Sequence, residues 1–139
     1  MNKVVLDTDI FSEITKQKNQ NVINKAKAYF AIWGYYTISV STVLEVVKGF
    51  HKVKDTVRMQ QFFQQLVNYE ILPLESDSAK VAGLLYADLE SNGKTIGRCD
   101  PIIAAIAIHN ALTLVTGNTK HYKRIQELGY PLKLENWKE

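Results

Sequence analysis

Three carboxylic acids and one asparagine stand where this chain changes from an apolar to a polar pattern. Asp7 ends the apolar run that starts at Lys3, Glu45 and Asp100 lie near the starts of helix-like segments, and Asn118 follows a fourth apolar run. Two carboxylates about 4 Å apart repel by roughly 4 kcal/mol at an effective dielectric near 20. A close cluster must therefore hold protons or a cation, and an all-oxygen set favours Mg²⁺ or Mn²⁺. Such an ion can support phosphodiester hydrolysis.

Alternating strand-like and helix-like segments provide the elements that would position these residues. Strands are predicted at 3–6, 36–40, 71–74, 112–116 and 132–134, and Pro73 places the third of them at a sheet edge. Helices are predicted at 10–16, 21–33, 41–51, 55–68, 77–89, 101–110 and 119–128. This order indicates an α/β fold with right-handed β-α-β connections and helices on both faces of the sheet. Strand ends and the starts of the next helices share one rim, where the four polar residues are expected to meet.

Composition narrows the class of protein. The 139 residues fit a single domain, and 46% hydrophobic with 22% charged residues is ordinary for a globular protein. A net charge of +3 is compatible with a polyanionic partner without requiring one. The single Cys99 excludes an internal disulfide and favours a reducing cytoplasm. The longest apolar block, 102–108, is too short to span a bilayer, so we expect a cytoplasmic protein without a membrane segment.

Each acid also has a purely structural explanation. Asp7 can cap a helix that begins near Asp9, since aspartate is a preferred N-cap residue. The segment from Thr42 to Glu45 matches a capping box. Asp100 followed by proline matches an N-cap with proline at the first helical position. Convergence of all three on one rim, rather than any single acid, favours a functional role.

Four stretches of the sequence together resemble a known family. They are Val4–Asp9, Ser41–Glu45, Ile96–Ala105 and Leu114–Asn118, and they resemble PIN-domain ribonucleases, above all the VapC-type toxins of toxin–antitoxin pairs. The likeness covers essentially the whole chain, 1–139, as one PIN-like nuclease domain. It implies a three-layer α/β/α fold with a five-stranded, mainly parallel sheet. It also implies that Asp7, Glu45 and Asp100 are the catalytic, metal-binding acids of an endoribonuclease that depends on Mg²⁺ or Mn²⁺.

The resemblance further implies partners and auxiliary residues. The partners would be an RNA substrate, with tRNA as one candidate, a cognate antitoxin protein, and a second copy in a homodimer. The auxiliary candidates are Asp9, where the family commonly has Asn or Ser and where we expect a helix cap, and Thr116 in the segment that ends at Asn118. Many family members carry a fourth acid after the fourth strand. This chain has none there, so Asn118 or His121 would take its place.

Basic residues beside the predicted rim are candidates for binding RNA. Lys94 and Arg98 lie in the loop before Asp100, and Lys120 lies in the last helix, from which they could contact RNA phosphates. The structural alternative is that they are ordinary solvated side chains.

Two other functions fit parts of the pattern. A HAD-type phosphohydrolase would use Asp7 and Asp9 as nucleophile and acid–base pair, although Phe11 stands where that family prefers Thr or Val. A non-catalytic PIN-like domain would only bind RNA or protein. The absence of a fourth acid supports this alternative. Cleavage of RNA with Mg²⁺ or Mn²⁺, absent with EDTA, would separate these alternatives from a nuclease.

Overall fold

A five-stranded parallel sheet forms the centre of the molecule. The computed structural model describes residues 1–94 and 96–139; Thr95, in the polar loop expected before Asp100, lies outside the described residues. Every strand pairing is parallel, and the order across the sheet is β3-β2-β1-β4-β5. The strands are β1 (Val4–Leu6), β2 (Thr37–Ser39), β3 (Glu70–Leu72), β4 (Thr113–Val115) and β5 (Leu134–Glu135). The predicted edge position of the third strand is confirmed.

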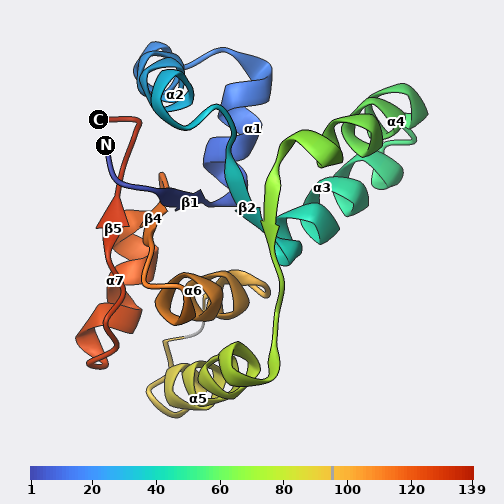
Figure 1. The fold of residues 1–139 in the computed structure, drawn as a ribbon. Coiled ribbons are helices and arrows are strands. Elements are labelled where there is room, and N and C mark those ends of the chain that lie inside the picture. Colours follow the sequence, from blue (N-terminus) through green and yellow to red (C-terminus); the bar gives the residue numbers. More distant parts are fainter. Residues whose placement is uncertain (95) are drawn as a thin grey trace.

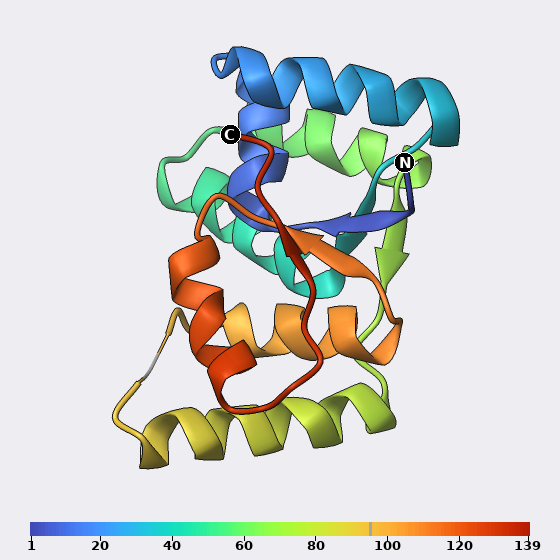
Figure 2. The same cartoon turned by 90° about the vertical axis from the view of Figure 1, so that its left-hand side faces the viewer.

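Helices cover both faces of this sheet, which confirms the predicted three-layer α/β/α fold (Figures 1 and 2). One face carries α1 (Thr8–Lys16), α2 (Gln20–Trp33), α3 (Val40–Lys52) and α4 (Thr56–Gln65), with a short 3₁₀ helix at Leu66–Asn68. The other face carries α5 (Ser76–Ser91), α6 (Asp100–His109) and α7 (Thr119–Glu127). Within the described residues, no helix has both the length and the apolar character needed to cross a bilayer.

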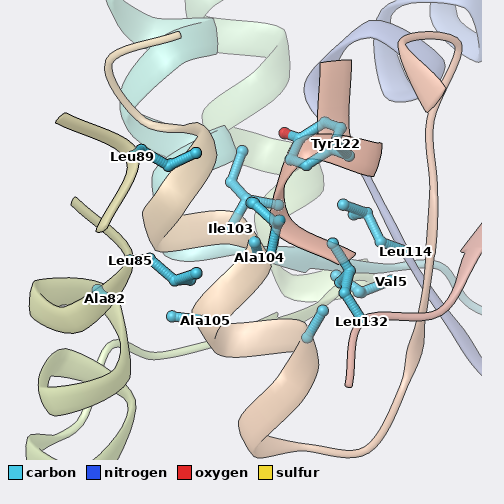
Figure 3. Packing of buried hydrophobic residues seen from close by; sticks show 12 residues of the cluster. Val5, Ala82, Leu85, Leu89, Ile103, Ala104, Ala105, Leu114, Tyr122 and Leu132 are labelled. Carbon is cyan, nitrogen blue, oxygen red and sulfur yellow. The ribbon is translucent and has the colours of Figure 1, made fainter. Parts of the chain in front are cut away.

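The apolar residues of the strands divide between these two layers. Val5 and Leu114 belong to the same buried cluster as Leu85 of α5 and Ile103 of α6, and Figure 3 shows this cluster. Val115, the neighbour of Leu114, packs into the other cluster, which is built from the first four helices. Adjacent side chains of a strand point to opposite faces, so a strand covered on both sides must be apolar throughout. This explains the uninterrupted apolar runs in the sequence.

Two of the predicted helix caps are misplaced, by three residues at α3 and by one residue at α6. The α3 helix begins at Val40, because the Ser39 side chain accepts the Thr42 N–H at 3.3 Å and caps the helix one turn earlier. The expected capping box between Thr42 and Glu45 therefore lies inside the helix and does not form. In α6, Cys99 occupies the cap position, so Asp100 is the first helical residue rather than the N-cap.

Candidate active site at the carboxyl ends of the strands

The carboxyl ends of β1 and β4 form the point at which the chain reverses its direction across the sheet. From β1 the chain proceeds through β2 to β3 on one side, and β4 and β5 lie on the other. Such a switch point is where open α/β sheets place their sites. The register pairs Leu6 with Val115, so the next residues, Asp7 and Thr116, face each other beyond the strands. The Thr116 hydroxyl donates to Asp7 Oδ2 at 2.8 Å.

Asp7 is a buried carboxyl in this junction, with 5% of its surface exposed. Its Oδ1 accepts the Thr8 N–H at 2.9 Å, so Asp7 is the N-cap of α1. This confirms the structural explanation that the sequence offered for Asp7. Burial raises the pKa of Asp7 to about 7, and the charges of Asp9 and Asp100 add to this effect. The hydrogen bonds from Thr116 and Thr8 oppose the increase in the pKa without cancelling it. Asp7 thus combines the N-cap role with a strongly perturbed carboxyl.

Asp9 connects α1 to the end of β4. Its Oδ1 accepts the Ile10 N–H at 2.8 Å, and its Oδ2 accepts the Gly117 N–H at 2.9 Å. Burial raises the pKa of Asp9, whereas the Gly117 N–H and the nearby Lys138 lower it. A Cβ at Gly117 would lie 2.6 Å from Asp9 Oδ2, so this contact requires glycine. The expected helix cap at Asp9 is wrong, because Asp7 is the N-cap and Asp9 is the second residue of α1. Asp9 instead joins the start of α1 to the residue after Thr116.

Asp100 comes close to Asp7 and Asp9 from the first turn of α6, and we call this group of three acids the acid pocket. Asp100 also contacts His121 of α7. The Gly97 N–H donates to Asp100 Oδ2 at 3.1 Å and to His121 Nε2 at 2.9 Å. The same Nε2 lies 3.2 Å from Asp100 Oδ2. A neutral imidazole that accepts the Gly97 N–H carries its proton on Nδ1, whereas a protonated one can donate to Asp100. His121 is thus placed to exchange a proton beside this acid.

Glu45 lies on the neighbouring side of the rim and is joined to Asp7 through Thr8. The Thr8 hydroxyl donates to Glu45 Oε1 at 2.8 Å and lies 2.9 Å from the Thr42 hydroxyl. Thr8 has only one hydroxyl proton, so Thr42 must donate to Thr8. Burial raises the pKa of the Cys99 thiol, and the charges of Glu45 and Asp100 raise it further. Both acids therefore lie close to Cys99, at the start of α6.

The Tyr122 hydroxyl supplies a test of whether the pocket suits a cation. It is fully buried and has no hydrogen-bond partner in the described part of the chain. Burial raises the pKa of Tyr122 well above its ordinary value, and the charges of Asp7 and Asp100 raise it further. The hydroxyl also approaches Asp100 and Asp7 closely enough to interact weakly with both, without a hydrogen bond of good geometry to either. A hydrated ion or a rearranged carboxylate would satisfy such a hydroxyl.

The donor set fits a hard divalent ion in its chemistry, since it consists of carboxylate and hydroxyl oxygens. In residues 1–94 and 96–139, however, no three His, Cys, Asp or Glu side chains already lie close enough to hold a metal ion. Joint binding by Asp7, Glu45 and Asp100 would therefore require their side chains to move. Asp7 and Asp100 already act on each other electrostatically, while Glu45 accepts a hydrogen bond from Thr8.

The other predicted residues lie around this pocket. Asn118 is exposed at the cap of α7, and its N–H donates to the Thr116 hydroxyl at 3.0 Å. Lys94 pairs with Glu127 at 3.4 Å, so part of its charge is neutralised within the protein. Arg98 and Lys120 are exposed.

Four contributors to the site were not predicted from the sequence: Thr8, Gly97, Tyr122 and Lys138. Gly97 had a usable signal, because a glycine three residues before an acid allows close backbone approach. A Cβ at Gly97 would lie 2.5 Å from Asp100 Oδ2. Tyr122 and Lys138 had no such signal, since they reach the pocket only through the packing of α7 and β5.

Comparison with known proteins agrees with this geometry. The PIN domain family matches residues 4–128. The tRNA(fMet)-specific endonuclease VapC of Shigella flexneri is 28% identical over 138 residues and 99% of each chain. Ribonuclease VapC2 of Rickettsia felis is 34% identical over 107 residues, covering 73% of this chain and 75% of its own. The structure of VapBC2 from Rickettsia felis, bound to a DNA fragment from their promoter, has a TM-score of 0.79 at 29% identity and covers 98% of this chain and 99% of its own.

These matches extend over nearly the whole chain and define its class. The protein belongs to the PIN-domain family, and within it to the VapC-type ribonucleases of toxin–antitoxin systems. The predicted family and enzyme class are thereby confirmed. The HAD-type alternative is not favoured, and both oxygens of its proposed second acid, Asp9, accept backbone N–H groups.

Proposed function

We propose that this protein is an endoribonuclease toxin that hydrolyses RNA phosphodiester bonds with Mg²⁺ or Mn²⁺ held by Asp7, Glu45 and Asp100. The observation that supports it most directly is the buried Asp7 carboxyl, which faces Asp9 and Asp100 at the switch point of a PIN-domain sheet. The name of the Shigella flexneri relative states a tRNA specificity, so we propose tRNA as the first substrate class to test. We expect the protein to act in the cytoplasm.

The side chains of the chain itself have distinct roles in this proposal. When bound, the divalent ion would activate the attacking water and stabilise the leaving oxygen. Thr116 and Thr8 orient the Asp7 carboxylate through their hydroxyl and N–H donors. Gly97 fixes Asp100 beside His121, because its N–H donates to both side chains. His121 and Asn118 lie in the region in which the family resemblance leads us to expect a fourth acid.

A groove beside the site is the surface that we propose for the antitoxin. It lies between α1, α3 and α4, has a volume of about 740 Å³, and includes Thr8 and Glu45 in its lining. Its apolar lining includes Phe11, Phe50, Phe62 and Tyr69, and Lys16, Lys18 and Arg58 are among its basic residues. An apolar segment with acidic flanks would suit it, and its occupant would lie against Glu45.

We also propose a homodimer. Val40 and Leu44 lie four residues apart on α3 with 41% and 56% exposure, and they offer an apolar face next to the site. Light scattering coupled to size-exclusion chromatography of wild type and Leu44→Glu tests this: the variant should be monomeric, and a monomeric wild type would refute it.

The proposed activity is tested by incubating the purified protein with total tRNA and with an unstructured RNA. Fragments with defined ends are expected in Mg²⁺ or Mn²⁺ and not in EDTA, and Asp100→Asn should abolish them. Asp77→Asn, an exposed change on α5, is the matched control and should cleave like wild type. Wild-type protein that leaves both RNAs intact in either metal would support the non-catalytic alternative instead.

A further inference from the structure

A lysine from the far end of the chain reaches the edge of the acid pocket. Lys138 follows β5, whose carboxyl end lies at the same rim as those of β1 and β4. Its Nζ is 3.8 Å from Asp9 Oδ2, and 37% of its side chain is exposed. The side chain also packs over Gly117, where a Cβ would come within 2.9 Å of both Cε and Nζ of the lysine. The ammonium group therefore lies against Gly117, the residue that follows Thr116, whose hydroxyl donates to Asp7.

The backbone on either side of this lysine is anchored by the burial of Trp137 and by hydrogen bonds. The segment after β5 runs towards α1 and α2 (Figures 1 and 2). Trp137 is fully buried, with its ring 5.7 Å from that of Tyr29. The Lys138 N–H donates to Asn136 Oδ1 at 2.9 Å, and the Asn21 side chain donates to the Lys138 carbonyl at 3.0 Å. The fold thus fixes where the lysine stem begins and leaves its charged end at the rim.

The contact with Asp9 does not account for this placement. A separation of 3.8 Å is longer than a hydrogen bond. Both oxygens of Asp9 already accept backbone N–H groups, from Ile10 and from Gly117. Partly exposed ion pairs contribute only about 0–1 kcal/mol to stability. The Lys138 ammonium therefore has N–H donors that Asp9 does not use. Such donors can bind an anion.

We propose that Lys138 is a substrate-binding residue whose ammonium group contacts a phosphate of bound RNA beside the acid pocket. This inference rests on the proposed ribonuclease function. Asp7, Asp9 and Asp100 repel an approaching phosphate backbone, and a lysine at the rim next to Asp9 offsets part of that repulsion. A flexible stem with a compact charge can swing from Asp9 onto a phosphate without any movement of the backbone.

The test compares three variants of the full chain. Lys138→Met removes the charge and keeps an apolar stem, Lys138→Arg keeps the charge, and Lys133→Met removes an exposed charge ahead of β5 as the matched control. The dissociation constant of a fluorescein-labelled oligouridylate RNA is measured by anisotropy in EDTA over a series of salt concentrations. One lost contact to a single strand should lower the salt slope by about 0.7 and weaken binding about 5-fold near 0.1 M salt. Arginine should restore both values.

Cleavage in Mg²⁺ supplies an independent readout. Lys138→Met should raise KM and leave kcat unchanged, because the contact is made equally in the bound substrate and in the transition state. Wild type that cuts RNA, with Lys138→Met matching it in affinity and salt slope, would overturn this inference and leave the ribonuclease function intact. An equal loss in Lys133→Met would also overturn it. Wild type that neither binds nor cuts RNA would overturn both proposals.

Discussion

Ionisation of Asp7 should lower the free energy of unfolding as the pH rises, whereas an acid with a lowered pKa has the opposite effect. Replacement of Asp7 by asparagine should remove this pH dependence. The pKa of Asp7 is raised from 3.8 to about 7, so the folded protein binds this proton more tightly than the unfolded chain does. The stability associated with Asp7 is therefore fully present below about pH 3.8 and is lost as the pH rises to about 7. Stability should decrease with pH across this window.

The size of the effect follows from the shift in the pKa. About three pH units correspond to roughly 4 kcal/mol, as an upper limit for a single buried group. The amide of asparagine has the shape of the carboxyl, and it can keep the Thr8 N–H bond and exchange a hydrogen bond with the Thr116 hydroxyl. Asp7→Asn should therefore gain stability relative to wild type as the pH rises. For a chain of this size the gain corresponds to a difference in Tm on the order of 10 °C between pH 4 and pH 8.

Thermal melts of both proteins in EDTA, followed by circular dichroism across this pH range, measure the difference directly. Asp77→Asn is the control, because its carboxyl lies exposed on α5 and its replacement leaves Asp7 in place. This control should follow the wild-type pH dependence. A difference in Tm between Asp7→Asn and wild type that stays constant from pH 4 to pH 8 would refute the reasoning.

Three other changes test how the pocket is held together. Loss of a residue that only supports a metal ligand slows activity by roughly 10- to 100-fold, so Glu45→Gln should slow RNA cleavage by at least this factor. The Tm should be nearly unchanged, and full activity would exclude a role as ligand. Thr116→Val removes the hydroxyl donor to Asp7 and should lower stability by about 1–3 kcal/mol in urea unfolding at pH 8; an unchanged midpoint would contradict this. Gly97→Ala places a Cβ 2.5 Å from Asp100 Oδ2, so Mn²⁺ affinity should fall while Tm stays near wild type, and unchanged affinity would show that Asp100 can move freely.

The sequence predicted the strands and their shared rim because this information is local. Apolar runs bounded by polar residues mark strands that are covered on both faces, and the acid at the end of β1 follows from such a run. The first residues of the helices could not be predicted in the same way, since several polar residues near a strand end can act as the N-cap. Ser39 and Thr42 both have the required side chain, and only the backbone path decides that Ser39 is the cap.

Side-chain relations between distant elements could not be predicted in this way. The hydrogen bond from the Thr8 hydroxyl to Glu45 depends on the distance between α1 and α3. The approach of Lys138 to Asp9 depends on how β5 and Trp137 pack, and no local pattern near residue 138 records it. Such contacts result from tertiary packing, which places residues from opposite ends of the chain against each other.

The most direct measurement is the binding of Mn²⁺ to the purified protein at pH 7.5, followed by electron paramagnetic resonance. The account predicts saturable binding to wild type, at least about 10-fold weaker binding to Asp7→Asn and to Asp100→Asn, and wild-type affinity in Asp77→Asn. Wild-type protein that binds no Mn²⁺, or Asp7 and Asp100 variants that bind it as tightly as wild type, would contradict the claim that these acids form a divalent-cation site.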